Sequence, residues 1–306
     1  MTIPVEQAQR VVTSLQAGRI QNLFAQSHAK HVLHEVNESP DNFPAFDKQL
    51  EDKVTFTAYA LLAASCSLLE QKTIEEGASG LEMAAVLLQN VHGPFVEESR
   101  ESSFHLLVSS MAFYASGHYS RAFVAIRQVE STTKEAGVIA AFIRKDFKSL
   151  IQRLNGILLQ DIPEFEDQTN LDQWAITIAI ARSLAYTLEF IMTGVEDIRS
   201  EIGRTLEDAS VIAMAGLSPS HWWIVRLLKL MLQKLSEASL WKTLPPFFDP
   251  EANSHLDRYV RLLAFSKTPV IELWASQRAA LSLALNPTNR GGVVNLKETE
   301  GSGLNI

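Results

Sequence analysis

The chain contains a single cysteine, Cys66, among its 306 residues. One thiol forms neither an internal disulfide nor a cysteine-based zinc site, so the sequence predicts a reduced, intracellular protein. Long apolar runs are also scarce: no stretch reaches the roughly 18 uninterrupted apolar residues of a membrane span. The N-terminus lacks a basic segment followed by an apolar one, which is the pattern of a secretion signal. We therefore expect a cytoplasmic protein with no membrane partner.

Positive charge is in short supply as well. The chain carries 27 Lys and Arg against 35 Asp and Glu, a formal net charge of −8. Such a chain has no overall attraction for a phosphate backbone, and no basic patch stands out along the sequence. The chain also lacks the glycine fingerprint of a dinucleotide site and the serine turn of an α/β-hydrolase. Its 46% hydrophobic and 20% charged residues are typical of a soluble globular protein.

Helical periodicity dominates what is present. In residues 81–91 the apolar side chains recur at steps of three and four, the spacing of a core-facing helix. Ser79 and Glu82 have the spacing of a capping box, which predicts that this helix starts beside them. Residues 102–130 predict two helices joined by a very short turn at Gly117, because glycine suits the left-handed position after a helix end.

These patterns predict an all-α protein in which residues 5–240 are almost wholly helical. The hairpin of residues 102–130 resembles a tetratricopeptide-type repeat, with small Ala112 and Ala122 where its two helices would approach closely. No second copy follows at a period near 34 residues, so we expect an irregular solenoid or bundle rather than a regular array. The only convincing strand candidate is "VVNL", residues 293–296.

Composition changes after residue 240, which suggests three parts. We assign residues 1–240 to a helical repeat-like N-terminal domain. Residues 241–268, which contain a proline pair and a loop, are predicted to be a linker. Residues 269–306 form a separate unit, and its sequence carries the strongest functional signal in the chain.

Three groups of residues invite binding hypotheses, but each group also has a structural interpretation, which we favour. Histidines at intervals of three could place two ligands toward one metal, or lie on a partly exposed helix face: His28, His31 and His34. The acidic residues 161–170 lack the spacing and glycine of a calcium loop and are predicted to be a solvated loop. Trp222 and Trp223, beside Arg226, could stack on bases, or pack in the core and at a domain contact. We predict no metal site and no catalytic residue.

The C-terminal unit contains an ordered series of motifs. Leu273, Trp274, Ala275, Ser276 and Gln277 are followed by a helix-forming stretch, then by the turn "PTNRGG" and the β-prone "VVNL". This order resembles the entry to the motor of a superfamily II helicase of the DEAD/DEAH-box type. In that family an aromatic residue, a proline and a glutamine precede a helix and the strand that leads to the phosphate-binding loop. Ala275 stands where proline is common in the family.

The resemblance implies a nucleotide site. Trp274 would pack on adenine, and the amide of Gln277 would both donate and accept hydrogen bonds at the adenine edge. The phosphate-binding loop would include Gly301, Ser302 and Gly303. Leu304 stands where the family has the lysine that neutralises the phosphates, and Asn305 where it has the hydroxyl that holds magnesium. We therefore expect a motor truncated at this loop. The family uses ATP and magnesium, and we expect both to bind poorly to this chain.

Two functions follow from the sequence. The first is an N-terminal accessory region of an ATP-dependent helicase, whose partners would be the missing motor domain or another protein, and nucleic acid, either DNA or RNA. Some members of that family act in bacterial defence against phage. The second is a freestanding helical scaffold that binds a protein partner and has no nucleotide chemistry.

Overall fold

The computed structural model describes residues 3–16, 19–36, 49–93, 100–129, 133–165, 167–247 and 253–284. Over these residues the chain is all-α, as its periodicity predicts, and the only strand-like pairing in them is one isolated antiparallel bridge between Ser239 and Glu272. The predicted strand at residues 293–296 lies outside the described residues. Within them, the expectation that residues 5–240 are almost wholly helical is confirmed.

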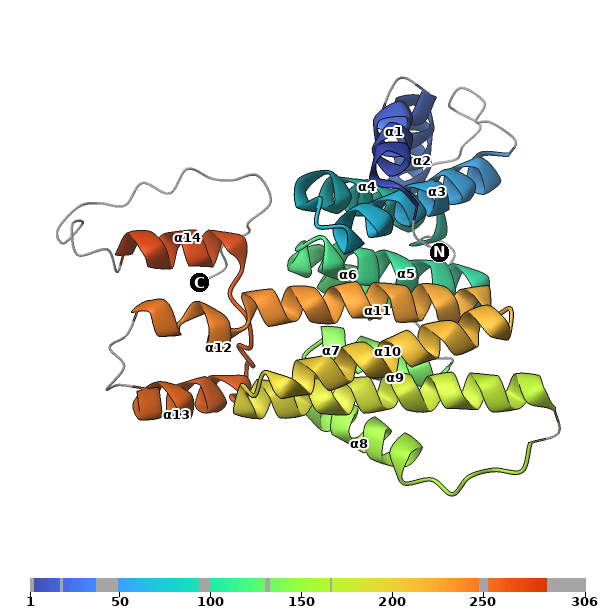
Figure 1. Ribbon diagram of the computed structural model, residues 1–306. Coiled ribbons are helices and arrows are strands. Elements are labelled where there is room, and N and C mark those ends of the chain that lie inside the picture. Colours follow the sequence, from blue (N-terminus) through green and yellow to red (C-terminus); the bar gives the residue numbers. More distant parts are fainter. Residues whose placement is uncertain are drawn as a thin grey trace.

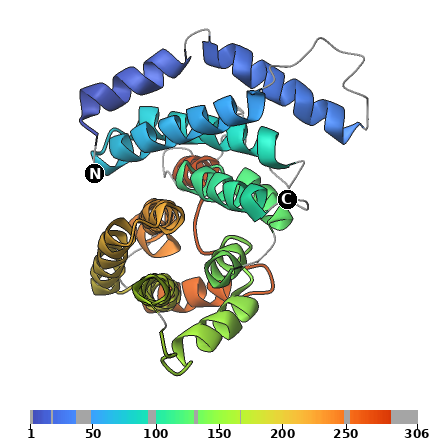
Figure 2. The same ribbon diagram turned by 90° about the vertical axis from the view of Figure 1, so that its right-hand side faces the viewer.

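The N-terminal part of the fold has two layers, drawn in blue and blue-green (Figures 1 and 2). Helices α1 and α2 cover α3 and α4, which pack against each other along their lengths. The bounds of these helices are Val5–Gln16 (α1), Arg19–Glu35 (α2), Leu50–Glu70 (α3) and Ile74–His92 (α4). Buried leucines and alanines of α3 and α4 belong to the main hydrophobic core.

Helix α4 begins earlier than its sequence suggests. Its first residue is Ile74, so Ser79 lies inside the helix and the predicted capping box at Ser79 is wrong. The glycines on either side of Ser79 are present because α3 passes very close by. A Cβ on Gly77 would lie 2.7 Å from Cγ of Leu69, and one on Gly80 would overlap a buried side chain of α3. These glycines permit close helix packing and do not end the helix.

The predicted hairpin at residues 102–130 is confirmed. It consists of α5 (Arg100–Ala115) and α6 (Tyr119–Gln128). Between them Gly117 has a φ of +90°, the left-handed conformation that glycine adopts without strain. The N–H of Gly117 donates to Tyr114 O at 2.9 Å, and that of His118 donates to Phe113 O at 2.8 Å. This pair of bonds closes the C-terminus of α5 as in a Schellman motif.

Five helices complete the helical body. They are α7 (Lys134–Ile143), α8 (Phe147–Leu158), α9 (Gln168–Thr193), α10 (Asp197–Ala215) and α11 (Pro219–Ala238). Helices α9 and α10 form an antiparallel pair, whereas α11 returns to pack on α5 and α3 (Figure 1). In a solenoid each repeat contacts only its neighbours in sequence. The return of α11 therefore makes this part an irregular closed bundle.

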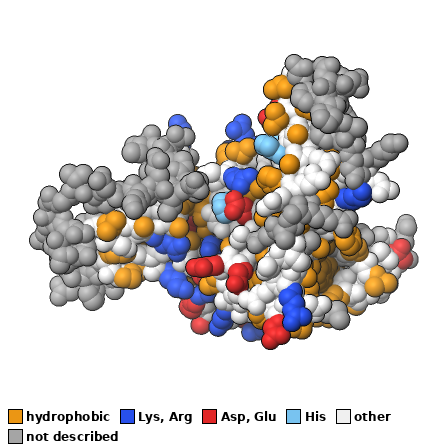
Figure 3. Space-filling view, turned by 90° about the horizontal axis from the view of Figure 1, so that it is seen from above, with side chains coloured by type: hydrophobic (Ala, Val, Ile, Leu, Met, Phe, Trp, Pro, Cys, Tyr) orange, Lys and Arg blue, Asp and Glu red, His pale blue; other side chains and the backbone are white. Residues whose placement is uncertain are grey.

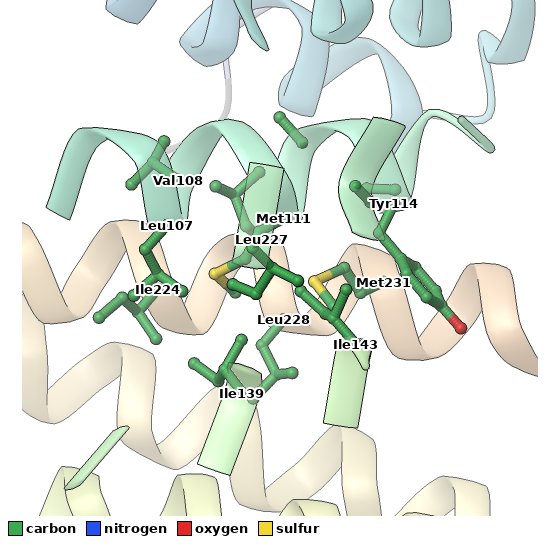
Figure 4. Packing of buried hydrophobic residues seen from close by; sticks show 14 of the residues in the cluster. Leu107, Val108, Met111, Tyr114, Ile139, Ile143, Ile224, Leu227, Leu228 and Met231 are labelled. Carbon is green, nitrogen blue, oxygen red and sulfur yellow. The ribbon is translucent and has the colours of Figure 1, made fainter. Parts of the chain in front are cut away.

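The core of the bundle lies where α5, α7 and α11 meet (Figure 4). The labelled side chains there are aliphatic or methionine, except for Tyr114, whose hydroxyl points out of the cluster at one end. Among them Val108, Met111, Leu227 and Leu228 have no exposed surface. Apolar burial of this extent is the main source of stability in such a domain.

Helix α9 is long and apolar enough to cross a membrane when judged by length and composition alone. Within this fold, 56% of its most apolar 18-residue window is buried inside the protein. It packs against α8, α7 and α10. These contacts are those of the central helix of a folded bundle.

Beyond α11 the chain forms a smaller unit, drawn in orange and red to one side of the body (Figure 1). We call it the C-terminal unit. Its elements are α12 (Leu240–Thr243), the 3-10 helix η3 (Pro245–Phe247), α13 (Asn253–Ala264) and α14 (Ala275–Ala284). The segment predicted as a linker thus contains α13 and most of α12. Its own small core consists of Leu240, Leu244, Leu256 and Val260, with Leu281 of α14 packed against it.

Candidate functional site

The stretch that carries the helicase resemblance begins in a segment that lies against the end of α11. Residues 270–274 run antiparallel to residues 238–240. Leu240 N–H donates to Ile271 O at 3.2 Å, and Leu273 N–H donates to Ala238 O at 2.9 Å. Ile271 is 4% exposed and Glu272 only 2% exposed, so the segment is built into the protein.

Glu272 is the centre of this junction, because its carboxylate is wholly buried. The hydroxyl of Tyr114 donates to its Oε2 at 2.7 Å. Lys145 Nζ lies 3.1 Å from Oε1 as an ion pair, although it is not aligned as a hydrogen bond. Burial, reinforced by the neighbouring negative charge of Glu272, raises the pKa of Tyr114 well above its ordinary value. The phenol therefore stays protonated and remains a donor to the carboxylate.

Lys145 reaches Glu272 from the turn between α7 and α8. Its φ of 57° places it in the left-handed region, which is uncommon for a residue with a side chain. Two backbone bonds hold the turn: Lys145 N–H donates to Phe142 O at 2.9 Å, and Asp146 N–H donates to Ala141 O at 3.0 Å. A lysine in this turn therefore presents its cation to a carboxylate from a distant part of the chain.

Trp274 follows Glu272 and packs against the helical body. Its indole is stacked on the ring of Tyr119, with ring centroids 6.1 Å apart and an interplanar angle of 18°. Tyr119 in turn meets Tyr114 edge to face at 4.9 Å. The side chain of Trp274 is partly buried against the main core. One face of the predicted adenine-packing residue is thus already used by a contact within the protein.

Gln277 lies in the first turn of α14 and is exposed. Its Oε1 accepts a hydrogen bond from the N–H of Trp274 at 2.9 Å. Trp274 precedes the first residue of α14, so Gln277 supplies one arm of a capping box at the start of that helix. The structure therefore brings Trp274 and Gln277 together, as the resemblance implies, and assigns Gln277 a role in the fold.

The two residues fit an adenine edge only in part. The Nε2 group of Gln277 remains available to donate, and Oε1 retains a second lone pair beside the one that serves the helix cap. The other predicted nucleotide-binding residues, Gly301, Ser302 and Gly303, lie outside the described residues. The adenine role of Trp274 and Gln277 stays a prediction.

The tryptophans at the start of α11 have structural partners. Trp222 and Trp223 meet edge to face at 4.9 Å and both pack against the main core. The guanidinium of Arg226 lies 5.0 Å from the centroid of the Trp222 ring, and its Nε donates to Glu70 at 2.8 Å. Arg226 is 8% exposed. This buried cation is paired with the carboxylate of Glu70, whose side chain is 27% exposed, and the pairing favours the structural interpretation of the tryptophan pair over base stacking.

The N-terminal histidines also have neighbours of their own. The ring of His28 stacks on Phe24 with centroids 6.3 Å apart, and His31 Nε2 lies 3.4 Å from a carboxylate oxygen of Glu35. The side chain of His34 lies outside the described residues. In the part of the chain that the structure describes, no group of three or more His, Cys, Asp or Glu side chains is arranged to hold a metal ion.

Sequence reasoning missed the buried polar cluster of Glu272, Tyr114 and Lys145. One signal was present, because Glu272 is the single charge in the apolar run "PVIELWA". A lone acid in such a run indicates a buried, partnered carboxylate. Its partners were not predictable, since Tyr114 lies 158 residues away and no local pattern links the two.

Comparison with known proteins gives one informative match. No family model matches the chain. Its sequence is 26% identical over 283 residues to Hachiman protein HamB from Bacillus cereus, an alignment that covers 92% of this chain and 25% of the relative. The chain is a distant relative of Hachiman protein HamB. It spans about a quarter of the length of that protein, and the alignment takes in nearly all of the helical fold described above.

Proposed function

We propose that this chain is a helical accessory region that works beside an ATP-dependent nucleic-acid helicase motor of the DEAD/DEAH-box type. The observation that carries the proposal is the alignment with HamB, which covers 92% of this chain but only 25% of the relative. The same helical region therefore occurs as one part of a much larger protein. The order of motifs from Leu273 to Gln277 indicates which kind of unit lies beside it.

The junction at Glu272 supports this role. Tyr114, Lys145 and the end of α11 hold the segment that leads into α14, so the orientation of Trp274 and Gln277 is fixed by the helical body. In an intact motor these two side chains would supply contacts to adenine. The helical body would then hold in place the two side chains that contact adenine in the motor.

The proposal predicts that this chain alone is not an ATPase. ATP and magnesium would need the lysine and the hydroxyl that Leu304 and Asn305 replace. Gln277 on its own would contribute only hydrogen bonds, worth about 1 kcal/mol each before ordering costs. Calorimetric titration of the chain with ATP and magnesium should show no binding in the micromolar range. Turnover that Gln277→Ala abolishes would contradict this expectation.

The proposal itself is tested on the coding DNA that follows codon 296, read in all three frames. A glycine-lysine-threonine loop and an acidic metal-binding motif in any frame would support a helicase motor beside this region. A partner gene product with these motifs that co-purifies with the chain would do the same. The absence of both from the neighbouring DNA would overturn the proposal.

A second candidate function is a freestanding scaffold that binds a protein partner. The observation that favours it is the use of Gln277 and Trp274 within the fold: one caps α14 and the other packs on Tyr119. Under this hypothesis both residues are structural. Proteins that co-purify with the chain can be identified. If none of them carries motor motifs, the result would support the scaffold hypothesis.

A further inference from the structure

The structure contains a cleft with a charge opposite to that of the whole chain. Its volume is about 660 Å³, and it lies between the α7–α8 turn and the segment that follows α13. Four cations line it, Arg144, Lys145, Lys148 and Lys267, against one carboxylate, Asp146. The chain as a whole carries a formal charge of −8. The cleft is therefore a local basic site on an acidic protein, of a size that suits a small anionic ligand.

Two of the cations are available to a ligand. Lys148 and Lys267 are exposed, and neither lies within ion-pair distance of a carboxylate in the described part of the chain, although Lys148 is near enough to Asp146 to help lower the pKa of that carboxyl. Lys145 is already paired with Glu272 at 3.1 Å. Because the two exposed lysines come from segments far apart in the sequence, an anion between them would be held from both walls of the cleft.

Arg144 adds a fixed positive charge to the wall of the cleft. Its Nη2 donates to Ile126 O at 2.8 Å, which fixes the guanidinium in place. Its Nε is buried and has no hydrogen-bond partner among the described residues. Because that nitrogen has almost no accessible surface, Arg144 acts on an anion in the cleft through its charge.

The cleft also has an aromatic wall. Phe265 lines it and is 47% exposed. Behind it lies Phe147, which is 6% exposed, with ring centroids 6.1 Å apart. A supported, half-exposed ring beside unpaired lysines has the two features that bind a nucleotide, a flat surface for the base and cations for the phosphate.

We propose that this cleft binds a nucleoside phosphate, with Lys148 and Lys267 on the phosphate and Phe265 against the base. The ligand is either a free nucleotide or a nucleotide within a single strand, since both present the same groups. The site is separate from Trp274 and Gln277, so the proposal stands apart from the helicase resemblance. Its residues belong to the helical body and to the segment after α13.

Asp146 sets a limit on the affinity of the cleft. Its carboxylate caps α8 by accepting the N–H of Ser149 at 3.1 Å and its hydroxyl at 2.6 Å. These bonds lower the pKa of Asp146, so the carboxylate is charged at neutral pH and repels a phosphate. Asp146→Asn removes that charge and keeps a good N-cap. It should therefore tighten binding.

The test measures binding of three probes to the full chain: adenosine 5′-monophosphate, inorganic phosphate and a labelled single-stranded oligothymidine. Titration calorimetry serves for the first two and fluorescence anisotropy for the third. The double variant Lys148→Gln/Lys267→Gln should weaken nucleotide or oligonucleotide binding by about tenfold or more and reduce its salt dependence. Asp146→Asn should strengthen it.

Arg153→Gln is the matched control. Arg153 is exposed, lies on α8 like Lys148 and is outside the cleft, so the variant changes the net charge without changing the site. It should shift affinity by less than about twofold, because a distant surface charge acts only through the screened overall field. Thermal unfolding of every variant checks that the fold is retained.

The outcomes separate the sources of the ligand. Nucleotide binding as tight as oligonucleotide binding identifies a free nucleotide, and binding of the oligonucleotide alone identifies a nucleotide within a strand. The proposal is overturned if neither the nucleotide nor the oligonucleotide shows saturable binding, or if the double variant binds these probes as tightly as wild type. It is also overturned if Arg153→Gln weakens binding as much as the double variant does. If inorganic phosphate binds as well as the nucleotide and Phe265→Ala changes nothing, no base is recognised and the nucleoside assignment is wrong.

Discussion

In the helical body, α5, α7 and α11 meet over apolar side chains such as Leu228 and Met231, both without exposed surface. The C-terminal unit meets that body through polar contacts in addition to apolar ones. The buried carboxylate of Glu272 contacts Tyr114 and Lys145, and the indole N–H of Trp241 donates to Ile191 O at 2.8 Å. The interface between the helices of the body is therefore held mainly by buried apolar surface. The interface with the C-terminal unit also depends on directional hydrogen bonds and an ion pair.

The difference has a physical meaning. Apolar burial stabilises any close packing of two apolar surfaces. A buried charge, in contrast, is stable only in the one arrangement that places its hydrogen-bond and ion-pair partners next to it. We infer that the helical body supplies most of the stability and that the Glu272 junction fixes the orientation of the segment leading into α14. Gly194 reinforces the same boundary, because a Cβ there would lie 2.6 Å from the indole of Trp241.

The largest expected effect lies in the apolar core. Leu228→Ala should lower the free energy of unfolding by about 2–5 kcal/mol, because a fully buried side chain is replaced by a cavity. Chemical denaturation measures the change. Leu159→Ala is the matched control, since Leu159 is 79% exposed and should change stability by less than about 0.5 kcal/mol. Equal losses in both variants would mean that α11 is not packed as described.

The junction should respond more weakly. Glu272→Gln keeps the shape of the side chain but removes the charge that Lys145 faces, and should cost about 1–3 kcal/mol. Adding Lys145→Gln should cost less than the sum of the two single changes, because the lone cation is then also removed. Glu164→Gln in the exposed loop before α9 is the control. Strict additivity would show that the two groups do not interact.

A pH dependence is expected from a histidine pair in the body. His92 and His105 have ring centroids 4.2 Å apart. His92 Nε2 is hydrogen-bonded to Thr55 at 2.8 Å, and His105 Nδ1 to Tyr59 at 2.7 Å. Burial lowers the pKa of His92 to about 3 and also lowers that of His105, although Glu101 acts in the opposite direction there. Both rings are therefore neutral in the folded protein at neutral pH.

The sign of the effect follows from these pKa values. The unfolded chain takes up protons near the ordinary histidine pKa of about 6.5, whereas the folded chain does not. Stability is thus fully present above pH 6.5 and falls below it, by about 1.4 kcal/mol per pH unit for His92. Denaturation midpoints between pH 7.5 and 5.5 measure it. His92→Gln should flatten the curve, and the control His255→Gln, at an exposed site, should not.

The helical character of the fold was predictable because its cause is local. Steps of three and four and the glycine at position 117 identify the helices and the α5–α6 hairpin without any long-range information. The start of α4 was not predictable in this way. Gly77 and Gly80 serve a contact with α3, and a tertiary contact leaves no distinct mark in a local pattern.

The sites also differ in whether their cause is local in the sequence or depends on the tertiary fold. The proximity of Trp274 and Gln277 follows from their spacing at a helix start and could be predicted from the sequence, whereas their adenine role stays a prediction. The basic cleft was missed because its lysines lie in "RKDFK" and at position 267, and only the fold brings these segments together. The partners of Glu272 were hidden for the same reason.

The smallest expected effect separates the two roles of Gln277. Gln277→Ala removes the acceptor for the N–H of Trp274 and should lower stability by about 0.5–1 kcal/mol, as loss of a helix cap does. Gln277→Glu keeps an acceptor at the capping position, so it should unfold like wild type. Reading of adenine needs an N–H donor as well, which glutamate lacks. In a protein that carries a working motor, both variants should therefore lose adenine preference, whereas only alanine should lose stability. If alanine and glutamate are both as stable as glutamine, the cap contributes nothing, and a nucleotide role becomes the better reason for this residue.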